Sequence, residues 1–396
     1  MTRRTCSLAV LIVLASLAAA EAGLFSVTNL VTDDQSVNKA QITDAHLKNP
    51  WGVSFSPVAG PFWVSDNKTH LATLYTVDPS TNATAKQALE VTIPGVGNVT
   101  GQAANPTSGF SGDPFLFVSE DGTISAWPGS GTLALILQTG STDNVYKGTT
   151  LDIVGGNTYL LSANFHSGKI DVLKGDTGIP NLTGSFTDPI LPANYAPFDI
   201  KRIGNTIYVT YALKNGDDDA PGPGHGIVSS FDLNGNFLAR IAGNGIGSPL
   251  NSPWGLEIAP KSFGALAGDL LVGNFGDGTI DAFNLSTKAF DGPLLGLDGK
   301  PLVIPGLWAL TVGNDDTAGS SNKLYFSAGP NDESNGLFGV IEFASSSEPT
   351  PTVPEPTAFA LMALGLAGIG ASRYASRQRR QPVSAQKTGV SGCGSF

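Results

Sequence analysis

The feature of this sequence that most constrains its fold is an internal repeat. A strand-like segment of β-branched, aromatic or aliphatic residues recurs six times, at intervals of about 44 to 63 residues. A four-stranded propeller blade with its loops needs roughly 40 to 50 residues. The repeat therefore predicts an all-β fold, a six-bladed β-propeller over residues 24–344 whose blades bury their apolar faces against one another. The six segments are Phe62–Asp66, Phe115–Ser119, Tyr159–Ala163, Ile207–Tyr211, Leu270–Asn274 and Leu324–Ala328.

The residues around the repeat predict how each blade turns and how the ring closes. Gly122, Gly168 and Gly278 lie where tight hairpin turns need a positive φ angle. Residues 25–31 alternate in polarity like a strand, so we expect them to complete the last blade beside residues 337–343. The innermost strands are expected to begin at Trp51, Thr107, Lys147, Phe198, Trp254 and Trp308.

The first 23 residues are typical of a signal peptide. Arg3 and Arg4 precede an apolar stretch from Leu8 to Ala20, and the small residues up to Ala22 suit signal peptidase. A stretch of about 13 apolar residues is too short to cross ~30 Å of hydrocarbon as a permanent helix. We therefore expect signal peptidase to remove this segment during export.

The C-terminal segment has three parts in the order of a sorting signal. Residues 345–356 form a Pro/Ser-rich linker, residues 357–380 an apolar helix with an arginine cluster, and residues 381–396 a polar tail. The arginines stay in the cytoplasm under the positive-inside rule, so the helix would hold the protein in the inner membrane transiently. The junction resembles the PEP-CTERM sorting signal of Gram-negative bacteria, which implies an exosortase as partner. A simple tail anchor is the alternative, because the polar tail extends beyond the usual end of such signals. The residues that carry the resemblance are Pro354, Glu355, Pro356, Arg373, Arg377, Arg379 and Arg380.

Charge and cysteine content restrict the ligands of the body. Residues 22–352 contain 15 Lys and Arg residues against 31 Asp and Glu residues, so nucleic acid would be repelled. Cys6 and Cys393 both lie in the terminal segments, which leaves the body without a disulfide or a thiolate metal site. We expect no cofactor beyond weak Ca²⁺ binding at Asp217, Asp218 and Asp219, since this run lacks the alternating spacing and the late Glu of an EF-hand.

Five stretches of the body resemble an uncharacterised family of secreted bacterial proteins that carry the PEP-CTERM signal, and the repeats are similar to NHL-type six-bladed propellers. The resemblance implies the propeller fold and a location in the periplasm, on the cell surface or in the extracellular matrix. It implies no activity. The stretches are Leu250–Leu256, Ala259–Gly264, Leu270–Gly278, Gly306–Leu310 and Leu324–Pro330.

Candidate ligand-binding residues gather at the mouth of the central channel, where the inner strands begin. Sugar lactonases of similar architecture hold a divalent cation there through Asn, Asp and Glu. Here four of the six expected entrances are aromatic, which argues against a calcium site because an aromatic ring offers no oxygen ligand. Aromatic rings beside polar groups can stack on sugars, and the alternative is that they pack between blades. The candidates are Trp51, Asp66, Glu120, Asn164, His166, Phe198, Trp254, Asn274 and Trp308, with the polar members expected in loops.

The sequence therefore favours an exported, noncatalytic propeller that binds an extracellular polymer, such as a polysaccharide, or a protein. The alternative function is a secreted metal-dependent hydrolase or lyase of the six-bladed lactonase type. His166 is the loop residue best suited to act as a base, but no serine elbow, His-x-x-x-His motif or pair of carboxylates accompanies it.

Overall fold

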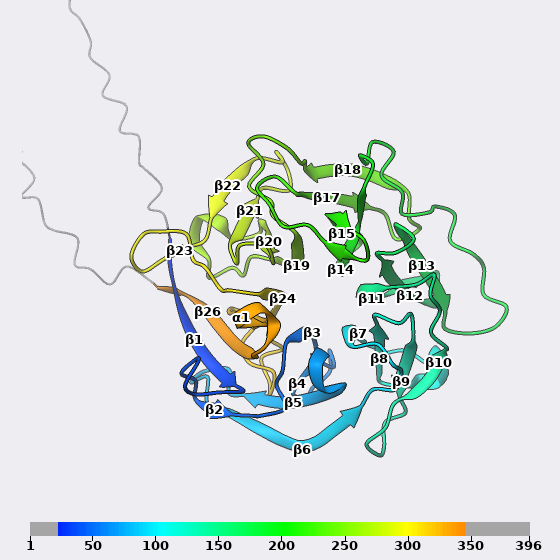
Figure 1. Cartoon of the computed structure of the whole chain (residues 1–396), viewed down its shortest axis with the longest axis horizontal. Coiled ribbons are helices and arrows are strands. Elements are labelled where there is room, and N and C mark those ends of the chain that lie inside the picture. Colours follow the sequence, from blue (N-terminus) through cyan, green and yellow to red (C-terminus); the bar gives the residue numbers. More distant parts are fainter. Residues whose placement is uncertain (1–22, 345–396) are drawn as a thin grey trace, which may run out of the picture. The chain divides into compact units, whose positions relative to one another are not determined.

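The protein folds into six small sheets arranged around a central axis (Figure 1). The structure is a computed structural model that describes residues 23–344, so the predicted signal peptide, linker, sorting helix and polar tail lie outside the described residues. The prediction of an all-β, six-bladed propeller is confirmed. Within residues 23–344, no helix is long and apolar enough to cross a membrane.

Blades 1 to 3 follow one another along the chain, each with its first strand at the central channel. Blade 1 consists of β3 (Pro50–Ser54), β4 (Phe62–Asp66), β5 (Leu71–Val77) and β6 (Thr84–Thr92). Blade 2 consists of β7 (Val99–Ala104), β8 (Phe115–Ser119), β9 (Ile124–Trp127) and β10 (Leu135–Gln138). Blade 3 has three strands, β11 (Tyr146–Val154), β12 (Asn157–Asn164) and β13 (Lys169–Lys174).

Blades 4 to 6 complete the ring. Blade 4 consists of β14 (Tyr195–Ile203), β15 (Thr206–Asn215), β17 (Gly226–Phe231) and β18 (Phe237–Ala242), with the short β16 (Asp218–Asp219) beside β15. Blade 5 consists of β19 (Pro253–Ile258), β20 (Leu270–Asn274), β21 (Ile280–Phe283) and β22 (Phe290–Pro293). Blade 6 consists of β24 (Leu307–Val312), β25 (Leu324–Ala328), β26 (Leu337–Ala344) and β1 (Leu24–Thr32), and β2 (Ile42–Thr43) and β23 (Leu295–Gly296) pair with β1. Loops carry the one-turn elements η1 (Asn67–Thr69), η2 (Phe110–Gly112), η3 (Gly264–Leu266) and α1 (Pro330–Glu333).

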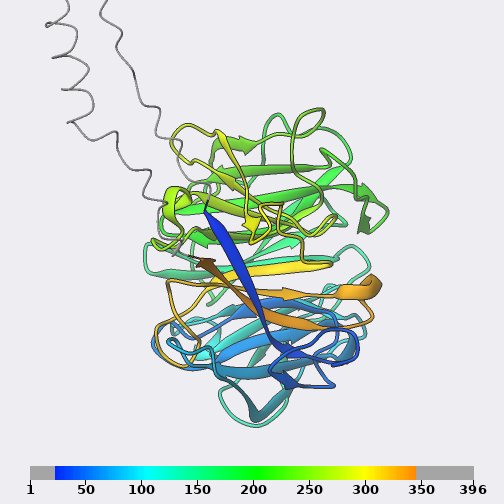
Figure 2. The same cartoon turned by 90° about the vertical axis from the view of Figure 1, so that its left-hand side faces the viewer.

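The N-terminal strand closes the ring, as predicted. Strand β1 runs antiparallel to β26, with Phe25 opposite Phe343 and Thr28 opposite Val340 (Figure 2). The last blade is thus built from both ends of the described chain. Such closure removes the open sheet edges that would otherwise expose unpaired backbone groups.

The repeat and turn predictions are confirmed, but two predicted inner-strand starts are wrong. The inner strand of blade 4 begins at Tyr195, three residues before the expected Phe198. The six repeated segments lie in the second strands of the six blades, and the three hairpin glycines have φ angles of 79°, 72° and 76°. The inner strand of blade 2, however, begins at Val99, and Thr107 lies in the loop that follows it. In residues 99–104 (VTGQAA), Thr100 takes the position that Trp51 has in blade 1, so no aromatic residue marks this strand.

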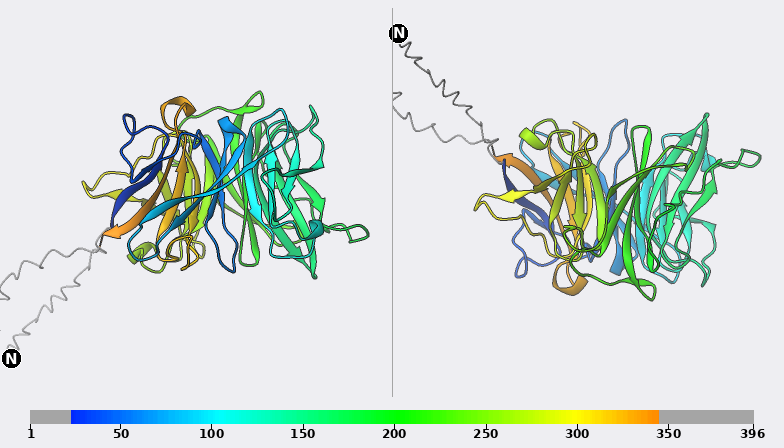
Figure 3. Two further views of the ribbon diagram at one scale, coloured as in Figure 1. Left: turned by 90° about the horizontal axis from the view of Figure 1, so that it is seen from below. Right: turned by 90° about the horizontal axis from the view of Figure 1, so that it is seen from above.

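The inner strands approach one another closely because five of the six have Gly or Ala at one shared position. A Cβ atom on Gly255 would lie 2.5 Å from the carbonyl oxygen of Trp308, so a larger residue would push two strands apart. The residues at this position are Gly52, Gly101, Gly148, Asp199, Gly255 and Ala309. We call the face on which the inner strands begin the upper face. It carries α1, as Figure 3 shows, and the opposite face is the lower face.

Candidate functional site

The predicted aromatic residues meet at the upper end of the channel and pack on one another. Trp51 stacks on Trp308 with 3.6 Å between ring centroids, and Trp254 meets both rings edge-on at 6.2 and 5.9 Å. Phe198 contacts Trp308 at 6.0 Å. All four side chains are at most 4% exposed, so these rings close the channel and their faces are covered by each other. We call them the aromatic plug.

A fifth aromatic residue, Phe275, lies half-buried above the plug. It follows β20 directly, stacks on Trp308 at 4.0 Å, and donates its backbone N–H to the carbonyl oxygen of Ser252. The next residue must be glycine, since a Cβ atom on Gly276 would lie 2.1 Å from Oδ1 of Asn251. These contacts fix Phe275 at the wall of a cavity of about 500 Å³ on the upper face, the upper cavity.

Acidic and amide side chains form the rest of the upper cavity. Asp277 follows Phe275, while Asn331, Asp332 and Glu333 reach the cavity from the loop between β25 and β26. Pro221, Val303 and Pro305 supply apolar surface. The cavity thus combines an aromatic ring with hydrogen-bonding groups, which is the combination that binds sugars through their apolar faces and hydroxyl groups.

The backbone of α1 is held in an unusual conformation at the cavity. Asn331, Asp332 and Glu333 all have φ angles between 50° and 61°, so α1 is a left-handed turn. Each such residue costs about 1–3 kcal/mol, and the surrounding contacts must compensate. Asn49 supplies one of these contacts, because its Nδ2 donates to the Glu333 carboxylate at 2.6 Å and its Oδ1 accepts from Nε1 of Trp308 at 2.9 Å. This hydrogen-bond chain connects the cavity wall to the aromatic plug.

The environment of Glu333 disfavours its charged form. Burial raises the pKa of Glu333, and Asp218 and Glu120 add to this effect, whereas Lys68 and the hydrogen bond from Asn49 oppose it. The upper cavity therefore holds a carboxyl group that keeps its proton to a higher pH than an exposed glutamate.

Two of the polar candidates, Glu120 and His166, form side-chain pairs. Lys147, which lies 5.2 Å from the centre of the Trp51 ring, contacts Glu120 at 2.8 Å and Asp218 at 3.4 Å. Burial alone would lower the pKa of Lys147, but the two carboxylates outweigh this effect and raise it. His166 contacts Asp217 at 2.7 Å, and both side chains are about half exposed. The side chains of Glu120 and His166 are thus partly exposed beside their partners, where a ligand can reach them.

Three polar candidates end strands instead of lying in loops, which corrects their expected position. Asp66, Asn164 and Asn274 are the last residues of β4, β12 and β20 and are at most 1% exposed. Asp66 accepts a hydrogen bond from Thr73, and the two asparagines donate to Asp171 and Asp281, each in the next strand of the same blade. The structure therefore places them inside their blades, and their role in ligand binding stays a prediction.

The run of three aspartates is dispersed over different partners. Asp217 contacts His166, Asp218 contacts Lys147, and Asp219 is buried, which raises its pKa to about 6. Across residues 23–344, one group of acidic and histidine side chains has metal-like spacing, Asp44, His46 and Glu90. The Lys86 ammonium contacts both carboxylates of that group, at 2.7 and 2.5 Å.

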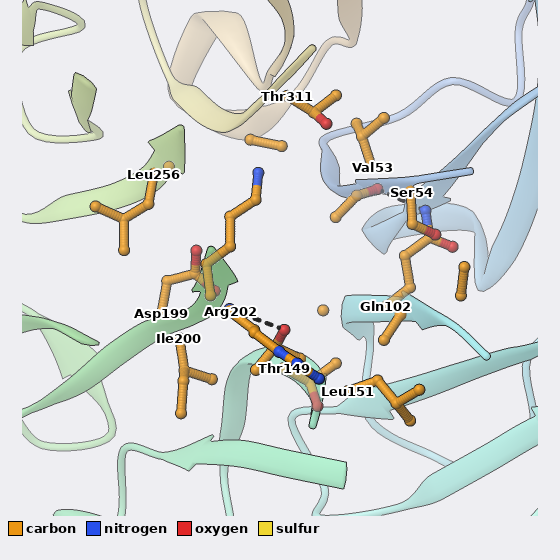
Figure 4. Close-up of a pocket in the computed structure, with 18 of the residues that line it drawn as sticks. Val53, Ser54, Gln102, Thr149, Leu151, Asp199, Ile200, Arg202, Leu256 and Thr311 are labelled. Carbon is orange, nitrogen blue, oxygen red and sulfur yellow. Dashed lines mark hydrogen bonds between the residues drawn. The ribbon is translucent and has the colours of Figure 1, made fainter. Parts of the chain in front are cut away.

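A second cavity, the lower cavity, opens beneath the plug. It measures about 350 Å³ and is lined by inner strands and the residues that follow them (Figure 4). Asp199, Gln102 and Ser54 line it with polar atoms. Sequence reasoning missed Phe275 and Asp199. The only sequence signal for Phe275 was that Asn274-Phe275 repeats the pair Asn164-Phe165. This signal was ambiguous, because Phe165 is fully buried.

The fold and the two cavities define the chain as a six-bladed β-propeller closed by its N-terminal strand, with candidate ligand sites at both ends of its channel. The chain belongs to the same family as two proteins of Acanthamoeba polyphaga mimivirus. It is 32% identical to uncharacterized protein R648 over 328 residues, which covers 77% of each chain. It is 31% identical to uncharacterized protein L690, over 75% of this chain and 81% of that one. These relatives are viral, so the predicted bacterial, NHL-like family is not confirmed and stays a prediction.

Other comparisons concern the C-terminus and the fold. Residues 352–373 match the PEP-CTERM protein-sorting motif, as the sequence predicts. Among solved structures, a glucose dehydrogenase is similar with a TM-score of 0.49 and 13% identity, over 81% of this chain and all of that one. A chain in a nidogen–laminin complex is similar with a TM-score of 0.42 and 14% identity, over 66% of this chain and 84% of that one.

Proposed function

We propose that this protein is a noncatalytic binding protein, exported from a Gram-negative bacterium and sorted to the cell surface or matrix by its PEP-CTERM signal, and that its upper cavity binds an extracellular polysaccharide. The sorting motif at residues 352–373 supports export and processing by an exosortase. The observation that carries the binding proposal is Phe275, a half-buried ring held rigidly on Trp308 at the wall of the upper cavity.

A polysaccharide suits this cavity for three reasons. An aromatic ring fixed by stacking presents its face without losing conformational freedom on binding, which favours contact with the C–H face of a sugar ring. Asp277, Asn331 and Asp332 are exposed beside it and accept or donate hydrogen bonds to hydroxyl groups. The cavity is open to the upper face, so it can hold one or two residues of a chain that continues across the surface. Glu120 and His166 do not line the upper cavity, so we propose them as contacts for the part of the polymer that continues across the surface.

Affinity electrophoresis through gels that contain bacterial exopolysaccharides tests the proposal. We expect at least one polymer to slow the protein, and Phe275→Ala to abolish most of that retardation. Phe290→Ala is the matched control, because Phe290 is 45% exposed on the outer strand of the same blade, away from the cavity. Equal retardation of wild type and Phe275→Ala, or no retardation by any polymer, would contradict the proposal.

The alternative is a metal-dependent hydrolase or lyase. It requires a cation held by oxygen ligands in the channel, where the inner-strand entrances carry the aromatic plug. Elemental analysis of the purified protein distinguishes the two functions. One equivalent of a divalent metal that is lost on mutation of channel residues would favour the enzyme.

A further inference from the structure

The inner strands have small residues at the position where they approach one another, with one exception. In blade 4 this position is Asp199, an acidic residue that lines the lower cavity. Five blades have Gly or Ala at the position where neighbouring inner strands approach, whereas blade 4 has Asp199. This residue fits because its neighbour across the blade interface is glycine. A Cβ atom on Gly148 would lie 1.9 Å from Oδ1 of Asp199. The interface between blades 3 and 4 therefore accommodates a carboxyl group. The fold does not require this group, since the other blades have Gly or Ala at the same position.

Asp199 is buried, and no side chain of residues 23–344 forms a hydrogen bond or ion pair with its carboxyl group. It is 6% exposed and lines the lower cavity (Figure 4). Burial raises the pKa of Asp199 well above its usual range, and only the Ile200 backbone N–H and the charge of Lys201 oppose this effect. Lys201 itself donates to Glu257 at 2.9 Å and to the carbonyl oxygen of Leu310 at 2.8 Å. The Asp199 carboxyl is thus available to a ligand.

Two polar atoms of residues that line the same cavity have no hydrogen-bond partner within residues 23–344. Gln102 is 6% exposed, and its Nε2 donates to the carbonyl oxygens of Gly52 and Trp63. The unpaired atoms are Oε1 of Gln102 and Oγ of Ser54, and both are buried. Buried polar atoms of folded proteins are almost always paired, with protein, water or ligand, so unpaired groups that line one cavity indicate something that binds there.

We propose that the lower cavity is a second ligand site, and that it takes a small uncharged molecule with several hydroxyl groups, of the size of one or two sugar residues. This site is separate from the upper cavity because the aromatic plug closes the channel between them. Hydroxyl groups exchange hydrogen bonds with Asp199, and they donate to Oε1 of Gln102 and Oγ of Ser54 after these buried atoms turn toward the cavity. Trp254, Leu256 and Leu310 supply apolar wall for the C–H groups of the ligand.

The charges around the cavity favour an uncharged ligand. Lys201 and Arg202 line it and are paired with Glu257 and Asp152 at 2.9 and 3.4 Å. Each positive group is already neutralised by its partner, so neither provides a free counter-charge. A volume of about 350 Å³ lies at the small end of the range for ligand pockets, which excludes a polymer from entering whole.

Saturation-transfer NMR on the full mature protein tests this site, with D-glucose, D-galactose, N-acetylglucosamine and cellobiose as probes and methylammonium and acetate as charged comparators. We expect transfer to at least one sugar and to neither ion. Asp199→Gly should weaken that binding at least tenfold while the melting temperature stays within a few degrees, because it installs the residue of blades 1, 2, 3 and 5. Asp199→Asn, which keeps the size of the side chain, should also weaken binding at least tenfold and is decisive if the glycine variant does not fold.

The two cavities are distinguished by crossed variants. Phe275→Ala should leave sugar binding at the lower cavity unchanged, and Asp199→Gly should leave polymer retardation unchanged. The inference is overturned if no sugar shows transfer, which would mean that water alone fills the lower cavity. It is also overturned if an ion binds in place of the sugars, or if both Asp199 variants bind sugar like wild type.

Discussion

The rings of Trp51 and Trp308 stack with their centroids 3.6 Å apart and their planes 21° from parallel, although they belong to the first and the last blade. The contact lies at the joint where the ring closes. Strand β1 closes blade 6 itself at its outer side by pairing with β26. The Trp51–Trp308 contact therefore contributes both to the packing of blade 1 on blade 6 and to the shape of the channel mouth.

Replacing Trp308 should destabilise the whole protein. The side chain is 1% exposed, contacts three other aromatic plug rings and Phe275, and donates to Asn49. We expect Trp308→Ala to lower the free energy of unfolding by about 3–5 kcal/mol, measured by chemical denaturation. Trp127→Ala, at the outer side of blade 2, is the control and should cost less. A loss under about 1 kcal/mol for Trp308→Ala would show that the plug is not a structural element.

Removing the closing strand should open the ring. Residues 24–31 include Phe25, Leu30 and Val31, which are at most 1% exposed, and each buried side chain of this type contributes about 1.5–3 kcal/mol. We expect deletion of residues 24–31 to lower the melting temperature by about 10 °C or more, or to prevent folding. An unchanged melting temperature would mean that β1 does not hold blade 6 closed.

The buried Asp281 should make stability depend on pH. It is 2% exposed, and burial raises its pKa from 3.8 to about 6, against a hydrogen bond from Asn274 and with help from the charge of Asp277. Because its folded-state pKa is raised, the stability it contributes is present below about pH 4 and is lost as the pH rises to about 6.

Asp281→Asn removes this loss. The free energy of unfolding of the variant relative to wild type should therefore increase by up to about 3 kcal/mol between pH 4 and pH 7. Urea denaturation at several pH values measures this difference. A difference that stays constant over the same range would mean that Asp281 ionises equally in the folded and unfolded states.

Processing at the sorting signal should shorten the protein. The PEP-CTERM motif covers residues 352–373, and we expect the exosortase to cleave near Pro354–Pro356. Mass spectrometry of the protein recovered from outside the cell should then show a C-terminus near this site. Replacing Arg373, Arg377, Arg379 and Arg380 by Gln should leave the protein unprocessed. Recovery of secreted protein that still ends at Phe396 would favour the simple tail anchor.

The blade architecture was predictable because each blade repeats the same local pattern. The second strands, the hairpin glycines and the closing strand all follow from polarity and from turn chemistry, which act over a few residues. Blade 2 shows the limit of this reasoning, since Val99–Ala104 forms an inner strand from small residues and no local pattern marks it. Its position is evident only in the structure, where β7 lies between β3 of blade 1 and β11 of blade 3.

The candidate site was predictable only in part. Sequence reasoning identified the aromatic entrances that meet in the plug, but it could not tell a covered ring from an exposed one. The exposure of an aromatic ring depends on neighbours distant in sequence. Trp308, for example, is covered by Phe275, which stacks on it. Asp199 was missed because its significance appears only when the six inner strands are compared at one position in space. Residues such as Asn164 look like ligands in sequence and are buried within their blades in the structure.

The most direct test of the account is a crystal structure of the protein with oligosaccharide fragments of a polymer that retards it in affinity gels. We predict a sugar ring stacked on Phe275 in the upper cavity, with its hydroxyl groups hydrogen-bonded to Asp277, Asn331 or Asp332. A fragment bound at any other surface, with the upper cavity filled by water alone, would contradict the central claim.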